Sequence, residues 1–335
     1  MKRNLFRPIL YVLFISSFSL LLLELFLRLL GFQPYQPRSS SRLLSDSPIF
    51  IEDTLVGYNN HPGTHHVLLN DVLAYTLTIH PDFSRESMVG KSSVGAPHVD
   101  IFGCSFFAGM GVNDNQTISY FLQSLLPDYQ VNNYSIPGHG LTTQYLLLNR
   151  LVKEGKVPKI AVFEMASFHL DRNIGADQYL ITFNNIAEKP YQYIYASLNR
   201  DSSLSFRLRD TYVSTPRIIY YSSIANQIFN FKLRKEFSLE EKLAVQRLLI
   251  VRIKDLCSKY HILPVFILIS QDDIAKSTIS TLKTTGLSYI ISDVKYKDPT
   301  FNLYPKDGHP NAKAHREYAK EIFKYLKKKG VFHEK

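Results

Sequence analysis

The chain has 335 residues, 45% hydrophobic and 20% charged, which suffices for one large domain or two smaller ones and excludes a wholly disordered protein. Its formal net charge of +10 favours anionic surfaces, but no dense Lys/Arg stripe with interleaved aromatic residues is present, so nucleic acid is not an expected partner. The two cysteines, Cys104 and Cys257, provide neither a disulfide framework nor a Cys-x-x-Cys metal pair.

The N-terminal segment combines cations with a long apolar run. Lys2, Arg3 and Arg7 precede a run from Ile9 to Leu30 in which the charged residues are Glu24 and Arg28. About 22 residues at a rise of about 1.5 Å each are enough to cross a bilayer. The two charged residues, four positions apart, can pair or reach toward an interface.

We expect residues 1–31 to be a cytoplasmic tip followed by a transmembrane signal anchor. No small-residue cleavage site follows the run and no cysteine is available there for lipid attachment, which favours an uncleaved anchor over a removed signal peptide. A monotopic anchor is the alternative. Cations also follow the run, at Arg38 and Arg42, so the positive-inside rule leans toward a cytoplasmic N-terminus and a periplasmic body.

Residues 32–97 are predicted to be a linker and an N-terminal extension. The Pro/Ser-rich stretch GFQPYQPRSSSR is typical of a juxtamembrane linker, and a polar, turn-rich stretch then continues to about Pro97. His61, His65 and His66 raise the question of a metal site. Because no carboxylate or cysteine stands at a recognisable ligand spacing, we interpret them as loop histidines.

From Val99 onward, short apolar runs alternate with amphipathic segments. Such alternation predicts an α/β fold with a mostly parallel sheet of about five strands and helices on both faces. The predicted strands are 99–102, 129–136, 159–165, 263–269 and 287–293. The predicted helices lie within 117–126, around 142–153, 238–260 and 272–285, and from about 311 onward.

Residues 174–237 form an aromatic-rich insertion between these elements. Its aromatic residues include Tyr191, Tyr193, Tyr195, Tyr220 and Tyr221. The insertion is interpreted either as a lid over a cleft or as an added packing layer, and the sequence favours neither.

Ser105 follows the first predicted strand of the sheet, where ligands bind in open α/β folds. A serine hydroxyl needs a base to become a nucleophile. Phe107 stands where a G-x-S-x-G elbow has its second glycine, so the motif is not that of the α/β-hydrolases.

Asp307 and His309 supply a candidate base after the last predicted strand. They flank one glycine, and Pro310 and Asn311 open the predicted final helix, which holds the loop in place. A carboxylate that accepts a hydrogen bond from one ring nitrogen orients the imidazole and leaves the other nitrogen to take the serine proton.

Three stretches, FGCSFFAGMGV, NYSIPGHG and DGHPNAKAH, resemble in order and spacing the first, second and last sequence blocks of the SGNH/GDSL hydrolase superfamily. The resemblance covers roughly residues 100–329 and implies a flavodoxin-like three-layer α/β/α fold in a domain spanning 98–335. It implies that Ser105 is the nucleophile, His309 the general base and Asp307 its orienting carboxylate. The backbone N–H groups of Ser105 and Gly138 would then form the oxyanion hole. Membrane-anchored bacterial members share the E-x-x-x-R pattern seen at Glu24.

Two departures from the family pattern bear on activity. The usual G-D-S is Gly103-Cys104-Ser105, which removes a carboxylate that braces the loop. Phe168 aligns with an asparagine that serves as an oxyanion donor, and loss of one donor costs ~3 kcal/mol of transition-state stabilisation. His169 is the candidate substitute donor.

Other residues of this region have open interpretations. Arg172 or Asn173 could also turn back into the site, or the stretch FHLDRN could be a structural turn with Asp171 and Arg172 as a surface pair. His139 could line the cleft or face solvent.

The leading hypothesis is a membrane-anchored serine esterase that cleaves a carboxylic ester of a glycan or lipid, with glycan O-acetyl groups as one candidate. No metal or organic cofactor is expected. An O-acyltransferase with the same triad is one alternative, and a binding or assembly protein that kept the fold without the activity is another. The sequence leaves substrate identity and oligomeric state open.

Overall fold

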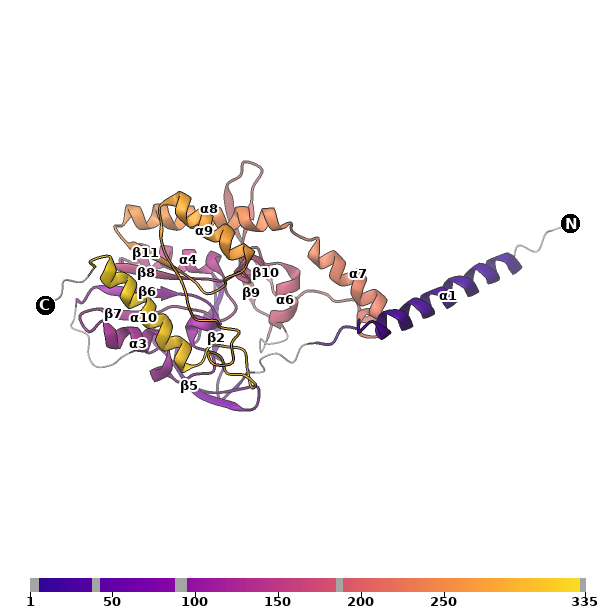
Figure 1. Cartoon of the computed structure of the whole chain (residues 1–335), viewed down its shortest axis with the longest axis horizontal. Helices are drawn as coiled ribbons and strands as arrows, with labels where there is room; N and C mark the ends of the chain where they lie inside the picture. The colour runs from indigo at the N-terminus through magenta and orange to yellow at the C-terminus, as the bar shows by residue number, and fades with distance from the viewer. Residues whose placement is uncertain (1–5, 38–42, 88–94, 185–188, 332–335) are drawn as a thin grey trace. The chain divides into compact units, whose positions relative to one another are not determined.

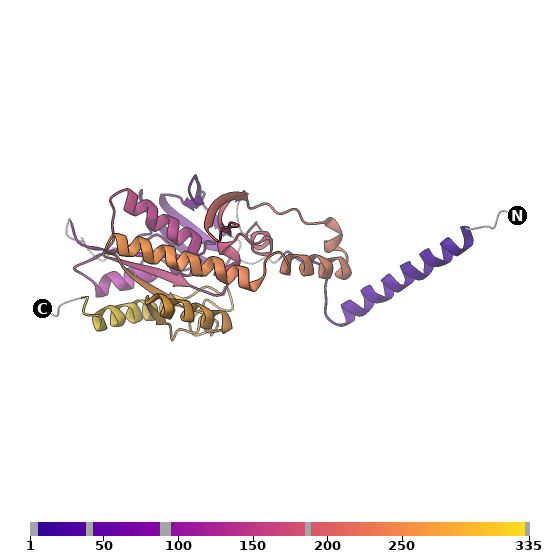
Figure 2. The same ribbon diagram turned by 90° about the horizontal axis from the view of Figure 1, so that it is seen from above.

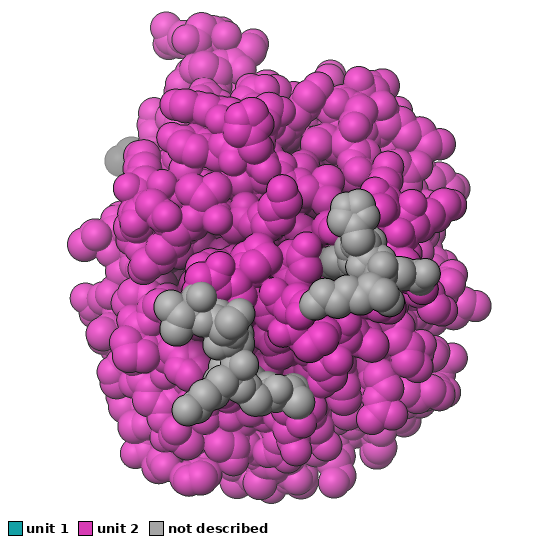
Figure 3. Space-filling model, turned by 90° about the vertical axis from the view of Figure 1, so that its left-hand side faces the viewer, with its two compact units in different colours: residues 1–38, 213–237 teal, residues 39–212, 238–335 magenta. Residues whose placement is uncertain are grey.

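The computed structural model describes residues 6–37, 43–87, 95–184 and 189–331. The chain forms two compact units, one made of residues 1–38 and 213–237 and the other of residues 39–212 and 238–335. Figure 3 shows one face of the second unit. Arg38 and Arg42, which entered the topology prediction, lie outside the described residues.

A five-stranded parallel sheet forms the centre of the second unit. Its strands are β6 (His98–Phe102), β7 (Gln130–Asn133), β8 (Ile160–Met165), β11 (Leu263–Leu268) and β12 (Ser288–Ile291). Their spatial order is β12-β11-β8-β6-β7, so the chain reverses direction across the sheet between β6 and β8. This is the flavodoxin-like order, in which ligands bind at the reversal point. The predicted fold class is confirmed.

Helices cover both faces of the sheet (Figures 1 and 2). α3 (Ile118–Leu125) and α10 (Ala312–Lys328) pack on one face, and α4 (Leu141–Lys153), α8 (Leu239–Lys259) and α9 (Asp273–Thr285) pack on the other. Several begin at a side-chain cap that satisfies an unpaired N–H of the first turn. These caps are Thr117, Ser238, Asp272 and Asn311.

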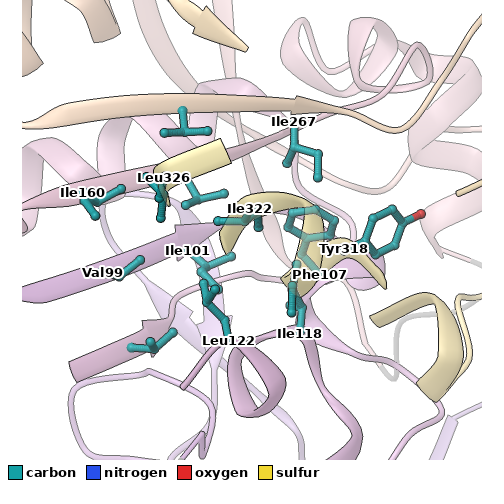
Figure 4. Packing of buried hydrophobic residues seen from close by; sticks show 14 of the residues in the cluster. Val99, Ile101, Phe107, Ile118, Leu122, Ile160, Ile267, Tyr318, Ile322 and Leu326 are labelled. Carbon is teal, nitrogen blue, oxygen red and sulfur yellow. The ribbon is translucent and has the colours of Figure 1, made fainter. Parts of the chain in front are cut away.

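Apolar side chains fill the space between the sheet and the α3 and α10 pair (Figure 4). Val99 and Ile101 point from β6 into this core, because alternate residues of a strand face opposite sides. On the other face of the sheet, Phe102 stacks on Phe163, and Phe163 on Phe266, at ring-centroid distances of 5.4 and 5.1 Å. Apolar residues on both faces explain why these strands read as continuous hydrophobic runs.

The N-terminal extension contains more regular structure than its polar sequence indicates. It forms β1 (Leu43–Ser45), β2 (Phe50–Asp53), β3 (Gly57–Asn60), β4 (Gly63–Leu69) and β5 (Leu73–Ile79), in antiparallel pairs. The interpretation of His65 and His66 as loop residues is wrong, because both lie in β4. The His65 ring is buried and contacts the Ser47 hydroxyl and the His61 carbonyl at 2.8 Å each.

The aromatic insertion is divided between the two units. α6 (Asp177–Asn184), β9 (Gln192–Leu198) and β10 (Leu204–Asp210) belong to the second unit. There Tyr191 and Tyr193 are buried, and their rings lie 5.4 and 6.5 Å from that of Tyr58. These two tyrosines therefore form a packing layer. Tyr220 and Tyr221 belong to the first unit and are exposed.

The first unit contains α1 (Phe6–Leu29), a short 3-10 helix η2 (Arg217–Tyr220) and α7 (Ser223–Arg234). Within the described part of the chain, the segment Arg7–Leu29 of α1 is long and apolar enough to cross a membrane, by length and composition. Glu24 and Arg28 pair at 2.7 Å on one face of this helix.

Candidate active site

Ser105 lies at the carboxyl end of β6, at the point where the strand order reverses. It is the first residue of the short helix α2 (Ser105–Ala108), and its side chain is buried. At the first position of a helix the backbone N–H has no intrahelical acceptor, so it is free to face a ligand.

The structure brings Ser105, His309 and Asp307 together, although Ser105 and His309 lie 204 positions apart in the sequence. The Ser105 Oγ lies 2.9 Å from the His309 Nε2, within hydrogen-bond distance. The His309 Nδ1 bonds to the Asp307 Oδ1, and the His309 backbone N–H donates to the same oxygen at 2.7 Å. The order hydroxyl, imidazole, carboxylate is the arrangement that proton transfer from serine requires.

The second oxygen of Asp307 is held by the N-terminal extension. The Asn70 side-chain amide donates to the Asp307 Oδ2 at 2.9 Å and to the Lys306 carbonyl at 3.1 Å. Asn70 sits in the turn between β4 and β5 with a φ of 55°, a conformation that asparagine tolerates better than most residues. Both carboxylate oxygens are thus fixed.

Aromatic rings form a wall beside the imidazole. The Phe106 ring lies 5.4 Å from the ring of His309, 5.4 Å from Tyr296 and 5.5 Å from Phe168. Phe168, which the sequence resemblance aligns with an oxyanion-donating asparagine, therefore contributes an apolar surface and no side-chain donor. The wall places apolar ring surface against one side of the imidazole.

A buried carboxyl group, that of Glu164 in β8, holds the residue just before Ser105. Its Oε2 accepts the Cys104 backbone N–H at 2.7 Å, and its Oε1 accepts the Cys104 thiol at 3.2 Å. Burial raises the pKa of Glu164, and burial raises the pKa of the Cys104 thiol to about 12, so the thiol keeps its proton and donates. Glu164 thus places a carboxyl group, from the neighbouring strand β8, beside Cys104, the residue that the sequence resemblance aligns with an aspartate.

Gly103 leaves the room that this contact needs. A Cβ at this position would lie 2.4 Å from the Glu164 Oε2 and 2.8 Å from the Phe107 Cβ. Any side chain at Gly103 would therefore displace either the carboxyl group or the nucleophile helix.

Arg85 fixes the loop that follows α2. Its guanidinium is fully buried and donates to the carbonyls of Ala108 and Gly109 at 2.6 Å each and of Val112 at 2.7 Å. It also pairs with Asp114 at 3.0 Å. A charged group buried this deeply is tolerated only when its donors are matched in this way.

The predicted oxyanion residues have different environments. Gly138 has a φ of +86°, and its carbonyl accepts hydrogen bonds from the hydroxyls of Tyr179 and Tyr193. The His169 ring is completely buried, its Nε2 lies 3.9 Å from the Glu164 Oε1, and neither ring nitrogen has a hydrogen-bond partner among the described residues. Burial lowers the pKa of His169 well below its ordinary value, so the ring is neutral. Its oxyanion role stays a prediction.

Neither interpretation of His139 is correct, because the ring is enclosed and neither faces solvent nor lines a cleft. It stacks between Tyr58 and Tyr193 at centroid distances of 4.3 and 5.2 Å, and its Nδ1 contacts the Thr143 hydroxyl at 2.7 Å. Burial lowers the pKa of His139 to about 3.

The stretch FHLDRN forms the short helix α5 (His169–Asn173), from which the Arg172 side chain turns back toward the site and contacts Cys104. The Asn173 side-chain oxygen caps α4 by accepting the Leu141 N–H at 2.6 Å. The suggested surface pair is wrong, because Asp171 bonds to Lys242 at 2.6 Å while Arg172 lies over the Phe168 ring at 4.5 Å.

Among the described residues, Cys104, Glu164 and His169 form a group whose potential ligand atoms lie within 4.8 Å of one another. In the structure the Cys104 thiol keeps its proton and donates a hydrogen bond to the Glu164 carboxyl group. Two members of the group, Cys104 and Glu164, are joined by hydrogen bonds, and the His169 ring nitrogens lie beside them without a hydrogen-bond partner among the described residues.

Sequence reasoning missed Asn70, Arg85 and Glu164. Glu164 left a signal, because it is the one charged residue of the buried strand IAVFEM. Asn70 and Arg85 left no signal in the sequence, because the groups that they bind are not their sequence neighbours: Asp307 lies 237 positions from Asn70, and Ala108 lies 23 positions from Arg85.

No protein-family model matches the chain, and no curated protein matches it in sequence. Solved structures are similar to it at low identity. TesA is 12% identical, with 69% of this chain and 99% of that chain covered and a TM-score of 0.40. The esterase EstA from Pseudoalteromonas sp. is 11% identical, with 70% and 99% covered and a TM-score of 0.41. A family two carbohydrate esterase from Clostridium thermocellum, in complex with cellohexaose, is 10% identical, with 72% and 66% covered and a TM-score of 0.38. Similarity at this level carries no argument about what this chain does.

Proposed function

We propose that the chain is a membrane-anchored serine esterase of the SGNH type. The observation that carries the proposal is the hydrogen-bonded series from the Ser105 hydroxyl through the His309 imidazole to the Asp307 carboxylate. A buried serine with a base at 2.9 Å is the minimum requirement for nucleophilic catalysis at an ester carbonyl.

In this mechanism the His309 Nε2 takes the Ser105 proton as the Oγ bonds to the ester carbonyl carbon, whose π electrons move onto oxygen. Backbone N–H groups, with Ser105 and Gly138 as the proposed donors, stabilise the oxyanion. The oxyanion collapses, the C–O bond to the alcohol breaks, and His309 returns the proton to the alcohol. Water repeats the sequence on the acyl-serine and releases the acid.

Asp307 acts through His309. Its carboxylate accepts the Nδ1–H, which fixes the tautomer that leaves Nε2 as the acceptor, and it stabilises the imidazolium formed after proton transfer. The amide of Asn70 keeps this carboxylate from rotating.

A cavity beside the site, lined by both polar and apolar side chains, supports an ester carried by a polar molecule, such as an O-acylated glycan. It has a volume of about 270 Å³ and lies where β11 and β12 end. Among its lining residues are Gln271, Asp272, Lys295 and Lys297, and its Tyr296 ring contacts the Phe106 ring of the wall. Side chains that combine amide, carboxylate and ammonium groups suit hydroxyl-rich ligands better than an acyl chain.

The anchor of this enzyme would be α1, with the second unit on the periplasmic side. The apolar length of Arg7–Leu29 and the cations before it support the proposal. A reporter whose activity depends on the compartment, fused after Lys335, tests this topology. Reporter activity in the cytoplasm alone would contradict it.

The decisive experiment for the activity is labelling with a fluorophosphonate probe, which reacts with activated serines. Wild type should be labelled, Ser105→Ala should not, and the matched control Ser167→Ala should be labelled like wild type, because its hydroxyl bonds to Asp272 and not to an imidazole. Folded wild-type protein that resists the probe would refute the proposal and favour a binding protein. Product analysis with and without a glycan acceptor then separates hydrolysis from acyl transfer.

A further inference from the structure

One face of the first unit carries exposed apolar side chains at helical spacing. In α7, Ile228 and Phe231 are 66% and 60% exposed, Ile224 lies one turn before them, and Tyr221, just ahead of the helix, is 77% exposed. These positions repeat at intervals of three or four residues, so they form a single stripe along the helix. A stripe of this kind in contact with water alone is unfavourable.

Cations accompany the stripe. Residues 213–237 contain Arg217, Lys232, Arg234 and Lys235, against one carboxylate, Glu236. The Lys235 Nζ lies 4.4 Å from the centroid of the Phe231 ring, so the ammonium group stands at the edge of the apolar stripe. Apolar and cationic side chains side by side are typical of helices that lie in the headgroup region of an anionic bilayer.

The start of α7 is fixed to α1 near the end of the candidate membrane span. The Glu24 carboxylate accepts the backbone N–H groups of Ser223 at 2.8 Å and Ile224 at 3.0 Å, and the Ser222 hydroxyl at 2.9 Å. Arg28 pairs with Glu24 and also donates to the Tyr221 carbonyl at 2.8 Å. The carboxylate thus binds the positive end of the α7 dipole.

This connection sets the depth at which α7 begins. Glu24 lies five residues before the end of α1 at Leu29, which corresponds to about 7.5 Å along the helix axis. If α1 spans a bilayer, α7 therefore starts close to the boundary between the acyl chains and the headgroups.

We propose that η2 and α7 lie on the membrane that holds α1, with the stripe Tyr221, Ile224, Ile228 and Phe231 inserted at the headgroup level and the cations at the lipid phosphates. The occupant of this surface is the anionic bilayer itself. The inference rests on the proposed membrane span of α1 and is independent of the esterase activity.

The absence of tryptophan from the sequence makes a direct test possible. Single-tryptophan variants of the full chain are reconstituted into vesicles of equal parts phosphatidylcholine and phosphatidylglycerol, with bromine on the lipid acyl chains as quencher. Phe231→Trp reports on the stripe, Phe14→Trp on the middle of α1, and Val157→Trp, an exposed site in the second unit, serves as the control.

Phe231→Trp should be quenched at least about twofold more than Val157→Trp, and best by bromine near the headgroup, whereas Phe14→Trp should be quenched best by bromine deep in the chain. If the lipid quenches Phe14→Trp but not Phe231→Trp, α1 is in the bilayer and α7 is not. This result would overturn the inference and support the anchor. If neither is quenched, the anchor fails and the inference fails with it. A blue-shifted but unquenched Phe231→Trp would place the stripe against protein, this chain or a second copy, and would also overturn it.

The cations give a second readout. In the Phe231→Trp background, three cations of α7 and its C-cap are reversed together: Lys232→Glu, Arg234→Glu and Lys235→Glu. Charge reversal should reduce quenching in the anionic vesicles, because each cation near an anionic surface contributes to binding. Quenching in vesicles of pure phosphatidylcholine should change little. Equal quenching before and after charge reversal in the anionic vesicles would contradict the proposed contact with the phosphates.

Discussion

At the residue scale, the orientation of the Asp307 carboxylate depends on a side chain from another part of the chain. One oxygen of Asp307 serves His309, and the other accepts the amide of Asn70. A carboxylate held at both oxygens presents a single lone-pair direction to the imidazole, which is the purpose of an orienting group in a triad.

Replacing Asn70 with glycine should lower kcat about five- to tenfold with little change in KM. Glycine accepts the φ of 55°, so the variant removes the hydrogen bond, which contributes about 1 kcal/mol, without straining the turn. Asp71→Gly, at the next residue with a φ of 58°, is the matched control and should behave like wild type. Steady-state kinetics on an activated ester measures both, and equal effects of the two variants would contradict the role of Asn70.

Gly103→Ala should greatly reduce fluorophosphonate labelling and destabilise the protein by about 1–3 kcal/mol, because its Cβ would overlap the Glu164 carboxyl group. Gly308→Ala is the comparison, since a Cβ there meets nothing within 4 Å although the residue lies between Asp307 and His309. Labelling rates and thermal unfolding report the two effects. A Gly103→Ala variant labelled as fast as Gly308→Ala would show that the contact does not position Ser105.

At the element scale, the N-terminal extension completes a site whose reacting groups it does not contain. The turn between β4 and β5 supplies Asn70, and Arg85 follows β5 and binds the carbonyls of the loop after α2. The extension therefore belongs to the same compact unit as the candidate site.

Arg85→Met should lower the free energy of unfolding by about 3–5 kcal/mol, because it leaves buried carbonyls and Asp114 without their donor. Arg209→Met is the matched control. Arg209 pairs with Asp177 at 2.7 Å, but both side chains are about one-third exposed, and such pairs contribute at most about 1 kcal/mol. Urea unfolding distinguishes the two. Similar losses in both variants would mean that the guanidinium does not hold the loop.

At the scale of the whole molecule, the buried Asp100 in β6 makes stability depend on pH. Burial raises the pKa of Asp100 from an ordinary value near 3.8 to about 7, against the opposing effect of the Asn132 amide, which donates to it at 2.8 Å. Between these two values the unfolded chain releases the proton while the folded chain keeps it. The Asp100 contribution to the free energy of unfolding therefore falls as pH rises through this window.

Asp100→Asn should remove this dependence. The difference in unfolding free energy, variant minus wild type, should increase between about pH 4 and pH 7, with a slope of up to about 1.4 kcal/mol per pH unit. The exposed Asp128→Asn is the control and should follow wild type across the range. Urea unfolding at a series of pH values measures the slope, and parallel curves for Asp100→Asn and wild type would refute the prediction.

The core strands and helices, and the positions of the candidate site residues relative to them, could be predicted from the amino-acid sequence. The strand expected at 99–102 is β6 (His98–Phe102), and the helix expected around 142–153 is α4 (Leu141–Lys153). These signals are local, because an apolar run bounded by turns or an apolar face of period 3.6 is contained within the segment itself. For the same reason, the sequence predicted that Ser105 follows the first core strand and that Asp307 and His309 follow the last one.

The contacts that hold Asp307 and Cys104, and the strands of the N-terminal extension, could be found only in the three-dimensional structure. Asn70 meets Asp307 across 237 positions of the chain, and Glu164 meets Cys104 across 60. Neither pairing leaves a local pattern. The strands of the extension were missed because a short, polar strand such as GTHHVLL is stable only beside its partners. A hydrogen bond between distant residues depends on how the whole chain packs, and that packing is a property of no single segment.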